Sequence, residues 1–293
     1  MILLLGGAGY VGTALARSLV ARGLEFSAPT RHELDVLDEE ALQKAVRTLR
    51  PRFAINAIGF TGRPNIDGTE HERLRCLQAN TVVPGILAEV FAAENIPWGH
   101  VSSGCIFDGT RPDGVPFDES DPPNFAFGDA RAGWYAKTKA MAEVLLRDAP
   151  RCLIWRMRIP FDEYDHPRNY LTKLLRYPKL LEVSGSISRR GEFADAAIES
   201  LCREVPSGIY NLTNPGVIST SEVVAALRRR GILHREPVFY QSTAEFLNEM
   251  PGRVYRANCA LEAKKIAAVG IPLREVHESL EEALAHWIPE RQS

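Results

Sequence analysis

The stretch Ile2-Leu3-Leu4-Leu5-Gly6-Gly7-Ala8-Gly9-Tyr10-Val11-Gly12 decides the fold. Its four leading apolar residues are typical of a parallel strand that is buried on both faces. Glycines at 6, 9 and 12 follow this strand, and residues 13–22 then show helical periodicity. The first glycine permits a tight turn, the second lets the backbone approach a pyrophosphate, and the third lets the helix pack closely on the strand. We therefore predict a nucleotide-binding βαβ unit; the alternative is a glycine-rich turn without a ligand.

Strands and helices continue to alternate beyond this unit. The predicted strands are 25–28, 53–57, 98–102 and 152–155, and the predicted helices are 39–49, 74–94 and 133–147. This alternation predicts an α/β Rossmann fold with a doubly wound parallel sheet. The long loop 104–131, rich in Pro, Gly and Asp, is of a length that is often functional.

The last third of the chain has a different pattern. Helices are predicted at 169–177, 193–204, 219–230 and 275–287, with short strands at 209–212 and 238–240. We expect a dinucleotide-binding domain over 1–160, to which segments around 190–212 return. Residues 161–293 would form mainly a smaller, mostly helical substrate lobe.

Composition excludes several classes of protein. The 293 residues carry a net charge of −2 and are 45% hydrophobic, which argues against a nucleic-acid coat, a membrane-surface protein and a disordered chain. The five cysteines are odd in number and show no CxxC, so neither a disulfide framework nor a zinc site is indicated. The apolar start is too short for a signal peptide or a membrane span. We expect a cytoplasmic protein with no metal, membrane or nucleic-acid partner.

The end of the second strand indicates which dinucleotide is bound. An acidic residue there would hold a ribose hydroxyl, whereas an arginine accommodates a 2′-phosphate. The residues are Thr30-Arg31-His32, so we expect NADP(H), with a solvated surface arginine as the alternative role of Arg31. The predicted cofactor-binding residues are Gly6, Gly9, Tyr10, Val11, Gly12, Arg31 and Asp35, together with Tyr135 and Lys139 below.

Three polar residues suit the reduction of a carbonyl group. Tyr135 and Lys139 lie four residues apart on a predicted helix and so share a face, and Ser103 lies at the end of the fourth strand. Tyr135 can donate a proton to the forming alkoxide, Lys139 can lower the pKa of the tyrosine and hold a nicotinamide ribose, and Ser103 can hydrogen-bond the carbonyl oxygen. Tyr-x-x-x-Lys alone is common on ordinary helices, but here it follows the glycine fingerprint.

These residues resemble the extended short-chain dehydrogenase/reductases. Longer stretches are similar to the plant nucleotide-rhamnose synthase/epimerase-reductases, which are related to dTDP-4-dehydrorhamnose reductase and GDP-fucose synthase. The stretches are "GFTGRPNID" (59–67), "SSGCIFDG" (102–109), "PPNF" (122–125), "YAKTKAMAE" (135–143), "RIPFDEYDHPRNYLTKLLRY" (158–177) and "GIYNLTNPGVIS" (208–219). The resemblance implies 3,5-epimerisation and 4-keto reduction of an NDP-4-keto-6-deoxysugar in one site, with NADPH as hydride donor, giving an NDP-rhamnose-type sugar.

The resemblance assigns roles to individual positions. Ser103, Tyr135 and Lys139 match the reductive trio, with Ser103 in place of the plant threonine. Cys105 and Lys173 match the epimerase acid/base pair, and Arg256 and Asn258 match a segment near the substrate nucleotide. The loop before Tyr135 is longer than in the plant pattern, and "GTEHERLR" after Asp67 diverges, so the base and sugar preferences stay open.

The chemistry of the epimerase pair agrees with the residue types. A 4-keto group acidifies the hydrogens at C3 and C5, and inversion needs one group to remove a proton and another to return it on the opposite face. A thiol can be tuned to act as base and a partly buried lysine as acid. A small buried cysteine and a solvated lysine are the alternative roles.

Weaker expectations concern further substrate contacts. Asn80 lies within a predicted helix, where asparagine is a poor helix former, so we expect a functional hydrogen bond. The other candidates, in loops or at a helix start, could bind sugar or phosphate, and capping or turn roles are about equally expected for them: Arg63, Asn65, Arg168 and Asn169.

Other functions stay open at this point. One alternative is a 4-keto reductase in which Cys105 has no catalytic role, and another is a non-catalytic NADP-binding regulatory subunit. A nucleotide sugar is the expected small-molecule partner, and a homodimer is one possibility for the oligomeric state.

Overall fold

A parallel six-stranded sheet forms the centre of the molecule. The computed structural model describes residues 1–289. The strands are β1 (Ile2–Leu5), β2 (Phe26–Ser27), β3 (Ala54–Asn56), β4 (Trp98–Ser103), β5 (Cys152–Met157) and β10 (Gly208–Asn211). Their order is β10-β5-β4-β3-β1-β2, and every neighbouring pair is parallel. The predicted doubly wound α/β fold is therefore confirmed, and its switch point lies between β1 and β3.

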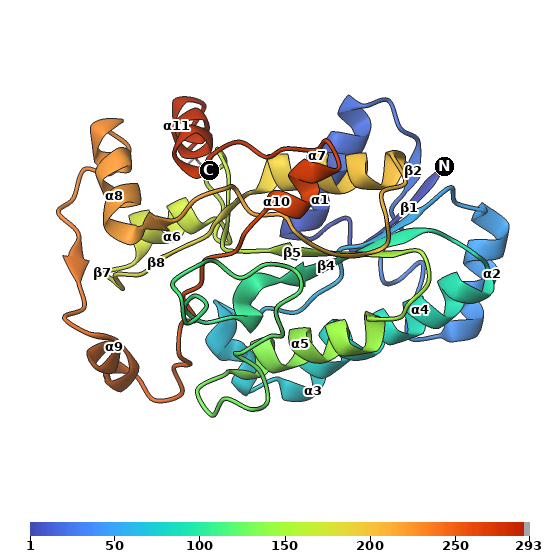
Figure 1. The fold of residues 1–293 in the computed structure, drawn as a ribbon, viewed down its shortest axis with the longest axis horizontal. Coiled ribbons are helices and arrows are strands. Elements are labelled where there is room, and N and C mark those ends of the chain that lie inside the picture. The colour runs from blue at the N-terminus through green and yellow to red at the C-terminus, as the bar shows by residue number, and fades with distance from the viewer. Residues whose placement is uncertain (290–293) are drawn as a thin grey trace.

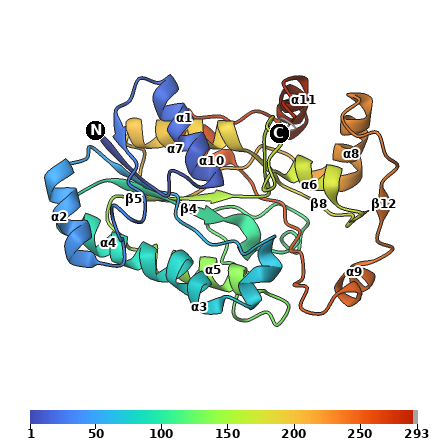
Figure 2. The ribbon, with the colours of Figure 1, turned by 180° about the vertical axis from the view of Figure 1, so that it is seen from behind.

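Helices cover both faces of this sheet (Figures 1 and 2). One face carries α1 (Tyr10–Ala21), α7 (Arg190–Cys202) and α10 (Lys264–Ala268); the other carries α2 (Glu39–Leu49), α4 (Val83–Ala93), α5 (Trp134–Leu146) and the short α3 (Arg73–Leu77). Each face has its own apolar core: Leu15, Trp155 and Phe193 lie in the first, and Leu87, Phe91 and Trp98 in the second. Burial of both sheet faces explains the wholly apolar β1.

The predicted helix 74–94 contains an irregularity. α3 passes into a π-helical turn, η2 (Gln78–Val82), and then into α4. Such turns are rare and are frequent at functional sites, and this one carries Asn80. By length and composition alone, the stretch Arg73–Ala93 could cross a membrane. Core helices of proteins outside membranes have the same length and composition, and here the stretch packs against α5.

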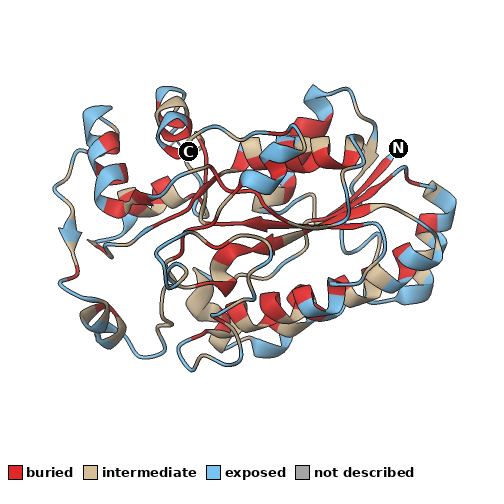
Figure 3. Ribbon diagram, viewed as in Figure 1, coloured by how far each residue is buried: buried red, intermediate tan, exposed pale blue. Residues whose placement is uncertain are grey.

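The C-terminal part has short strands and a separate core. Two-stranded ladders join β6 (Pro160–Phe161) to β9 (Ser188–Arg189), β7 (Lys179–Leu180) to β12 (Val238–Phe239), and β8 (Ser184–Gly185) to β11 (Ile218–Ser219). The helices are α6 (Tyr170–Arg176), α8 (Thr220–Arg229), α9 (Thr243–Glu249) and α11 (Val276–Ala285). Buried apolar residues of α6, α8 and α11 form this core. Figure 3 shows it as buried segments beside the sheet, with largely exposed outer faces on α8 and α9.

Some elements differ from the predictions. α1 begins at Tyr10 and α7 at Arg190, each three residues before its predicted start. β12 lies within the predicted strand 238–240. The other strands of the ladders, α9 and α10 were not predicted, because elements of two to seven residues carry little periodicity. α10 packs through Ile266 into the core under α1 and α7, and β10 joins the main sheet, so late segments return to it. The domain boundary at 160 stays a prediction, and residues 290–293 of the predicted lobe lie outside the described residues.

Candidate active site

Most of the predicted site residues gather at the carboxyl ends of the central strands, where open α/β sheets bind ligands. The glycine loop follows β1, Ser103 ends β4, and α5 brings Tyr135 and Lys139 to the same edge. Two short 3-10 helices, η1 (Ile66–Glu70) and η3 (Gly104–Ile106), lie in the loops after β3 and β4.

The glycine loop has the shape that a dinucleotide needs. Gly6 has φ +79°, and a Cβ there would lie 2.7 Å from the backbone carbon of Ala57. A Cβ at Gly12 would lie 2.1 Å from the carbonyl oxygen of Gly6, so the close packing of helix on strand requires glycine. No side chain caps α1 at Gly9, which leaves the N–H groups of its first turn available to an anion. The loop therefore fits a pyrophosphate.

The Tyr10 side chain turns away from this loop toward the C-terminal part. Its ring stacks on His166 with centroids 4.7 Å apart, and its hydroxyl donates a hydrogen bond to Asp162. Arg190 pairs with Asp162 and donates a 2.6 Å hydrogen bond to the carbonyl oxygen of Tyr10. Val11 packs against the core under α1. Side-chain contact with a cofactor is therefore not the evident role of these two residues, although their backbone N–H groups remain at the helix start.

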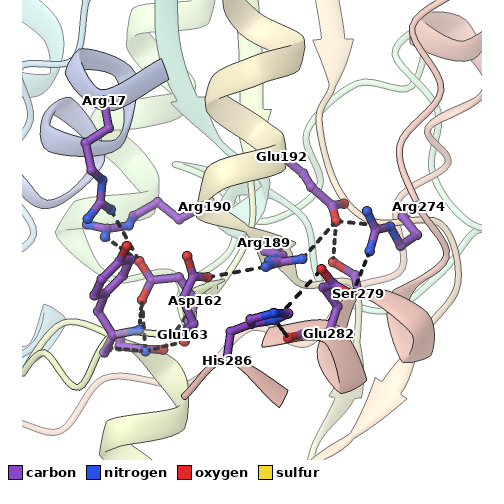
Figure 4. A network of polar contacts seen from close by, with 12 residues as sticks. Arg17, Asp162, Glu163, Arg189, Arg190, Glu192, Arg274, Ser279, Glu282 and His286 are labelled. Atoms are coloured by element: carbon purple, nitrogen blue, oxygen red, sulfur yellow. Dashed lines mark hydrogen bonds and ion pairs between the residues drawn. The ribbon is translucent and has the colours of Figure 1, made fainter. Parts of the chain in front are cut away.

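Asp162 is the centre of a polar network that sequence reasoning missed. Figure 4 shows Arg17 from α1 and Arg190 from α7 converging on Asp162. The network extends through Arg189, which lies 3.5 Å from both Glu163 and Glu192. It joins the glycine-loop helix to the segment before α6, so it couples the placement of the two parts of the site.

The predicted determinants of NADP(H) lie on an exposed turn after β2. Arg31 is exposed, and its side chain forms no hydrogen bond or ion pair with residues 1–289. Glu33, the nearest acid, accepts a 2.8 Å hydrogen bond from the Thr30 N–H, so its carboxylate stabilises the turn. Asp35 accepts one of 3.0 Å from Leu37 N–H. Arg31 is thus available to a 2′-phosphate, and its role stays a prediction.

The structure brings the reductive trio together. Ser103 is only 4% exposed and interacts through its side chain with Tyr135. Burial raises the pKa of Tyr135, so the phenol holds its proton at neutral pH. Lys139 donates a 2.9 Å hydrogen bond to the Val101 carbonyl, and burial lowers its pKa to about 8 against the opposing charge of Glu143. A protonated phenol beside a hydroxyl and a lysine is suited to donating a proton to a carbonyl oxygen.

Asn80 differs from the expected substrate contact. It is fully buried; its side-chain oxygen accepts a 2.8 Å hydrogen bond from Phe60 N–H, and its amide donates one of 2.9 Å to the Phe60 carbonyl. The amide also contacts the hydroxyl of Thr138, next to Lys139, at 3.2 Å. All polar atoms of Asn80 are used within the protein, so it holds the loop after β3 against α5 instead of reaching a substrate.

The side chains of Cys105 and Lys173 lie close enough for their charges to interact. Cys105 lies in η3, two residues after Ser103, and its Sγ accepts a 3.0 Å hydrogen bond from Arg158. Lys173 lies on α6, and burial together with the positive charges of Arg168 and Arg256 lowers its pKa to about 8, while Cys105 opposes that shift. Its ammonium has no hydrogen-bond or ion-pair partner within the described chain. The structure thus brings Cys105 and Lys173 near one another, and their roles as an acid/base pair stay a prediction.

The remaining predicted substrate residues divide into caps and cations. Asn65 caps η1, and the fully buried Asn169 caps α6 through a 3.0 Å hydrogen bond from Leu171 N–H. Capping, the alternative weighed for both, is what the structure shows. Arg168 donates hydrogen bonds to the Thr61 hydroxyl and the Gly62 carbonyl. Burial lowers the pKa of Arg168, and the positive charge of the exposed Arg63 lowers it further.

Arg256 lies in an ion pair that joins two loops. Both terminal nitrogens of its guanidinium donate to Asp67, at 2.8 and 2.7 Å. Burial alone would raise the pKa of the Asp67 carboxyl. Hydrogen bonds from Arg256 and Val254 outweigh the effect of burial, so the pKa is lowered. Asn258 is held nearby by its N–H, which donates a 2.9 Å hydrogen bond to Asp108. The substrate-binding roles of Arg256 and Asn258 stay predictions.

Comparison with known proteins identifies the family. The model of the RmlD substrate binding domain matches residues 1–288. The chain is 30% identical to an Arabidopsis thaliana bifunctional dTDP-4-dehydrorhamnose 3,5-epimerase/dTDP-4-dehydrorhamnose reductase, over 95% of this chain and 90% of that protein. It is 32% identical to the A. thaliana trifunctional UDP-glucose 4,6-dehydratase/UDP-4-keto-6-deoxy-D-glucose 3,5-epimerase/UDP-4-keto-L-rhamnose-reductase RHM2, over 95% of this chain but only 41% of that longer protein.

Solved structures share the fold. The L780 UDP-rhamnose synthase of Acanthamoeba polyphaga mimivirus superposes with a TM-score of 0.88 at 23% identity, covering 97% of this chain and 98% of that one. The dTDP-4-dehydrorhamnose reductase of Bacillus anthracis, solved in complex with NADP, has a TM-score of 0.79 at 18% identity and covers 98% and 97% of the two chains. Together with the match along nearly the whole sequence, these likenesses show that the chain belongs to the RmlD substrate-binding-domain family.

Proposed function

We propose that this chain uses NADPH to reduce the 4-keto group of an NDP-4-keto-6-deoxysugar and also inverts C3 and C5 of the same sugar, giving an NDP-rhamnose-type 6-deoxyhexose. One observation carries the proposal: Ser103 and Cys105 lie at one strand end, and Tyr135 interacts with both. A reductive proton donor and a candidate carbon base are thus adjacent. The printed activities of the Arabidopsis relatives support the same pair of reactions.

The reductive half rests on groups fixed by the sheet. NADPH, when bound, supplies the hydride that reaches C4. Tyr135 holds the proton that the C4 oxygen needs, and the Ser103 hydroxyl can hydrogen-bond that oxygen before and after it gains charge. Lys139, with its pKa lowered to about 8, is positioned by Val101 and carries positive charge near the phenol at neutral pH. That charge stabilises the phenolate which remains after proton donation.

The epimerase half needs one base and one acid. The Cys105 thiolate would take the proton from C3 or C5, forming an S–H bond while the C–H electrons pass into the enolate of the 4-ketone. The Lys173 ammonium would then return a proton to the same carbon from the other face, leaving a neutral amine. Proton exchange with solvent resets both groups. The pKa of Lys173 near 8 suits an acid that must give up its proton readily at neutral pH.

Cofactor binding is assigned to the residues around the glycine loop. Gly6, Gly9 and Gly12 give the backbone room for a pyrophosphate, and Arg31 is the available cation for a 2′-phosphate. The NADP complex of the B. anthracis reductase, which shares this fold, supports NADP(H). Arg63 and Arg168 lie close enough for their charges to interact, and Arg256, although paired with Asp67, acts on Lys173; we assign the anionic part of a nucleotide sugar to this group of arginines.

The decisive experiment separates the two reactions. The chain is incubated with NADPH and either UDP- or dTDP-4-keto-6-deoxyglucose, and products are identified by NMR. We expect a rhamnose-configured product with at least one of the two nucleotides. A product reduced at C4 but unchanged at C3 and C5 would leave a plain reductase, and no reduction with either substrate would contradict the proposal.

A further inference from the structure

Two buried arginines at the end of β5 have different partners. Arg156 and Arg158 are 1% and 2% exposed. Arg156 forms a two-pronged ion pair with Glu143, with contacts of 2.8 and 3.1 Å. Arg158 pairs with no carboxylate of the described chain; its guanidinium donates to the Ala257 carbonyl and, at 3.0 Å, to Cys105 Sγ. Its Nε–H is buried without an acceptor among the residues described.

This difference leaves a buried positive charge to be balanced. A buried ion is costly unless an opposite charge or strong hydrogen bonds compensate for its lost hydration. A carbonyl oxygen offers only a dipole, whereas an ionised sulfur would offer a full negative charge in a charge-assisted hydrogen bond. A neighbouring arginine is one of the settings that favour the thiolate form of a cysteine.

The other groups near Arg158 do not supply this charge. Cys259 interacts with the guanidinium, but its thiol donates to the Gly104 carbonyl at 3.3 Å, and burial raises its pKa to about 11. Asp108 acts on Arg158 from further away and already pairs with Arg131 at 3.0 Å. The groups that face Cys105 from α5 and α6 are Tyr135, which keeps its proton, and Lys173, whose positive charge favours an anionic sulfur.

We propose that Arg158 is a positioning residue that keeps Cys105 as a thiolate and fixes the direction of its sulfur. Its meaning for catalysis rests on the proposed epimerase function; the thiolate itself does not. Because Arg158 is anchored to the Ala257 carbonyl, one guanidinium ties the irregular segment before α10 to η3, and so sets where the sulfur lies relative to Ser103 and Tyr135.

The test measures how fast iodoacetamide alkylates Cys105 as the pH is varied. The thiolate displaces iodide to form the S–C bond, so the rate follows the thiolate fraction. The full-length chain without substrate is used, and each cysteine is quantified by peptide mass spectrometry. Cys202, partly exposed on α7 and with its pKa raised by burial, serves as the reference thiol in the same sample.

We expect the alkylation of Cys105 to stay nearly constant from mildly acidic to mildly alkaline pH, while that of Cys202 climbs steadily. Arg158→Met should slow Cys105 at neutral pH by about tenfold or more and restore a climbing profile, and Arg158→Lys should recover much of the rate because it restores the charge. A wild-type profile for Cys105 that climbs in parallel with Cys202 would overturn the proposal. So would an unchanged profile in Arg158→Met.

Folding is checked by circular dichroism. If Arg158→Met does not fold, the wild-type profile and Arg158→Lys still decide the question. Deuterium exchange at C3 and C5 of the sugar, measured separately, distinguishes the two ideas. A flat alkylation profile without deuterium exchange would support the thiolate and contradict the epimerase function. Deuterium exchange with an alkylation rate that climbs with pH would support the epimerase function and contradict the thiolate.

Discussion

Lys139 and Lys173 share one site and a pKa lowered to about 8, yet they are held in different ways. Lys139 is buried on α5, its ammonium donates to the Val101 carbonyl, and Glu143 lies one helical turn away. Lys173 lies on α6, whose apolar residues belong to the separate C-terminal core, and burial together with the positive charges of Arg168 and Arg256 lowers its pKa. A fixed cation can stabilise a charge that forms beside it, whereas an unpaired one can give its proton away.

The same difference holds for the two sides of the site as a whole. On the sheet side, hydrogen bonds within the protein position Lys139 and the loop after β3. On the α6 side, the positive charges of Arg168 and Arg256 act on Lys173, whose ammonium has no partner in the described chain. We therefore expect the two sides to fail separately when mutated.

The largest expected effect is that of Tyr135→Phe. Removal of the proton donor should lower the rate of reduction by about 10²–10⁴-fold, while the packed ring and NADPH binding are kept. The rate is followed as NADPH oxidation with a 4-keto sugar, and NADPH binding is titrated as the control. Near-normal oxidation would remove the assigned role.

Cys105→Ser should have an effect of similar size on the other reaction. A hydroxyl of nearly equal size is a far weaker acid than a thiol, so proton removal at C3 and C5 should slow by about 10²-fold or more. Reduction of a sugar that is already epimerised should continue. Deuterium uptake from solvent, read by NMR, measures the first quantity, and wild-type uptake would leave a 4-keto reductase.

Lys173→Met tests the cost of burying an unpaired cation. Because the folded-state pKa lies near 8 and the ordinary value is 10.5, the unfolded chain binds more protons between these pH values, and stability should rise with pH across that window. The variant should lack this rise and be more stable than the wild type at neutral pH by up to about 3 kcal/mol. Urea unfolding at several pH values measures it; equal slopes in both proteins would be inconsistent with a depressed pKa.

Asn80→Ala should lower the stability of the protein, whereas Lys173→Met should raise it. It leaves the buried polar groups of Phe60 without partners, so we expect a loss of about 1–3 kcal/mol in the free energy of unfolding. Reduction should weaken along with it, since the loop beside Lys139 loosens. Thermal unfolding and NADPH oxidation are measured on the same sample. A variant with wild-type stability would show that the buried contacts of Asn80 do not brace the sheet side.

Arg31→Ala should have the smallest effect and lies outside both sides of the site. Loss of a charge-assisted bond to a 2′-phosphate should weaken NADPH binding by about tenfold and leave NADH nearly unchanged. Fluorescence titration with both cofactors gives the comparison. Equal losses would assign the arginine no role in cofactor choice.

The sequence predicts the sheet side better than the α6 side, for physical reasons. Periodicity and local spacing are enough to predict β1, the glycine loop and the Tyr135–Lys139 pair. In the fold these lie together at the carboxyl ends of the central strands. The partners of Arg158, Asp162 and Asp67 lie up to 189 residues away along the chain, so no local pattern indicates them. One signal was available for Arg158: a charged residue directly after a wholly buried strand must find a partner.

Asn80, Asn65 and Asn169 show a second limit. Asparagine in an irregular segment signals a specific hydrogen bond, but not whether the partner is a ligand or the backbone. In all three the side-chain oxygen accepts a hydrogen bond from a backbone N–H, and the Asn80 amide also contacts the Thr138 hydroxyl.

The most direct test of the account follows both reactions at once in heavy water. Tyr135→Phe and Cys105→Ser are each given NADPH and the 4-keto-6-deoxysugar, and deuterium at C3 and C5 is measured beside NADPH oxidation. The account predicts exchange without NADPH oxidation in Tyr135→Phe. In Cys105→Ser it predicts no exchange, but retained NADPH oxidation when a sugar that is already epimerised is supplied instead. Loss of both reactions in each folded variant would contradict the claim that one site holds two separable sets of proton-transfer groups.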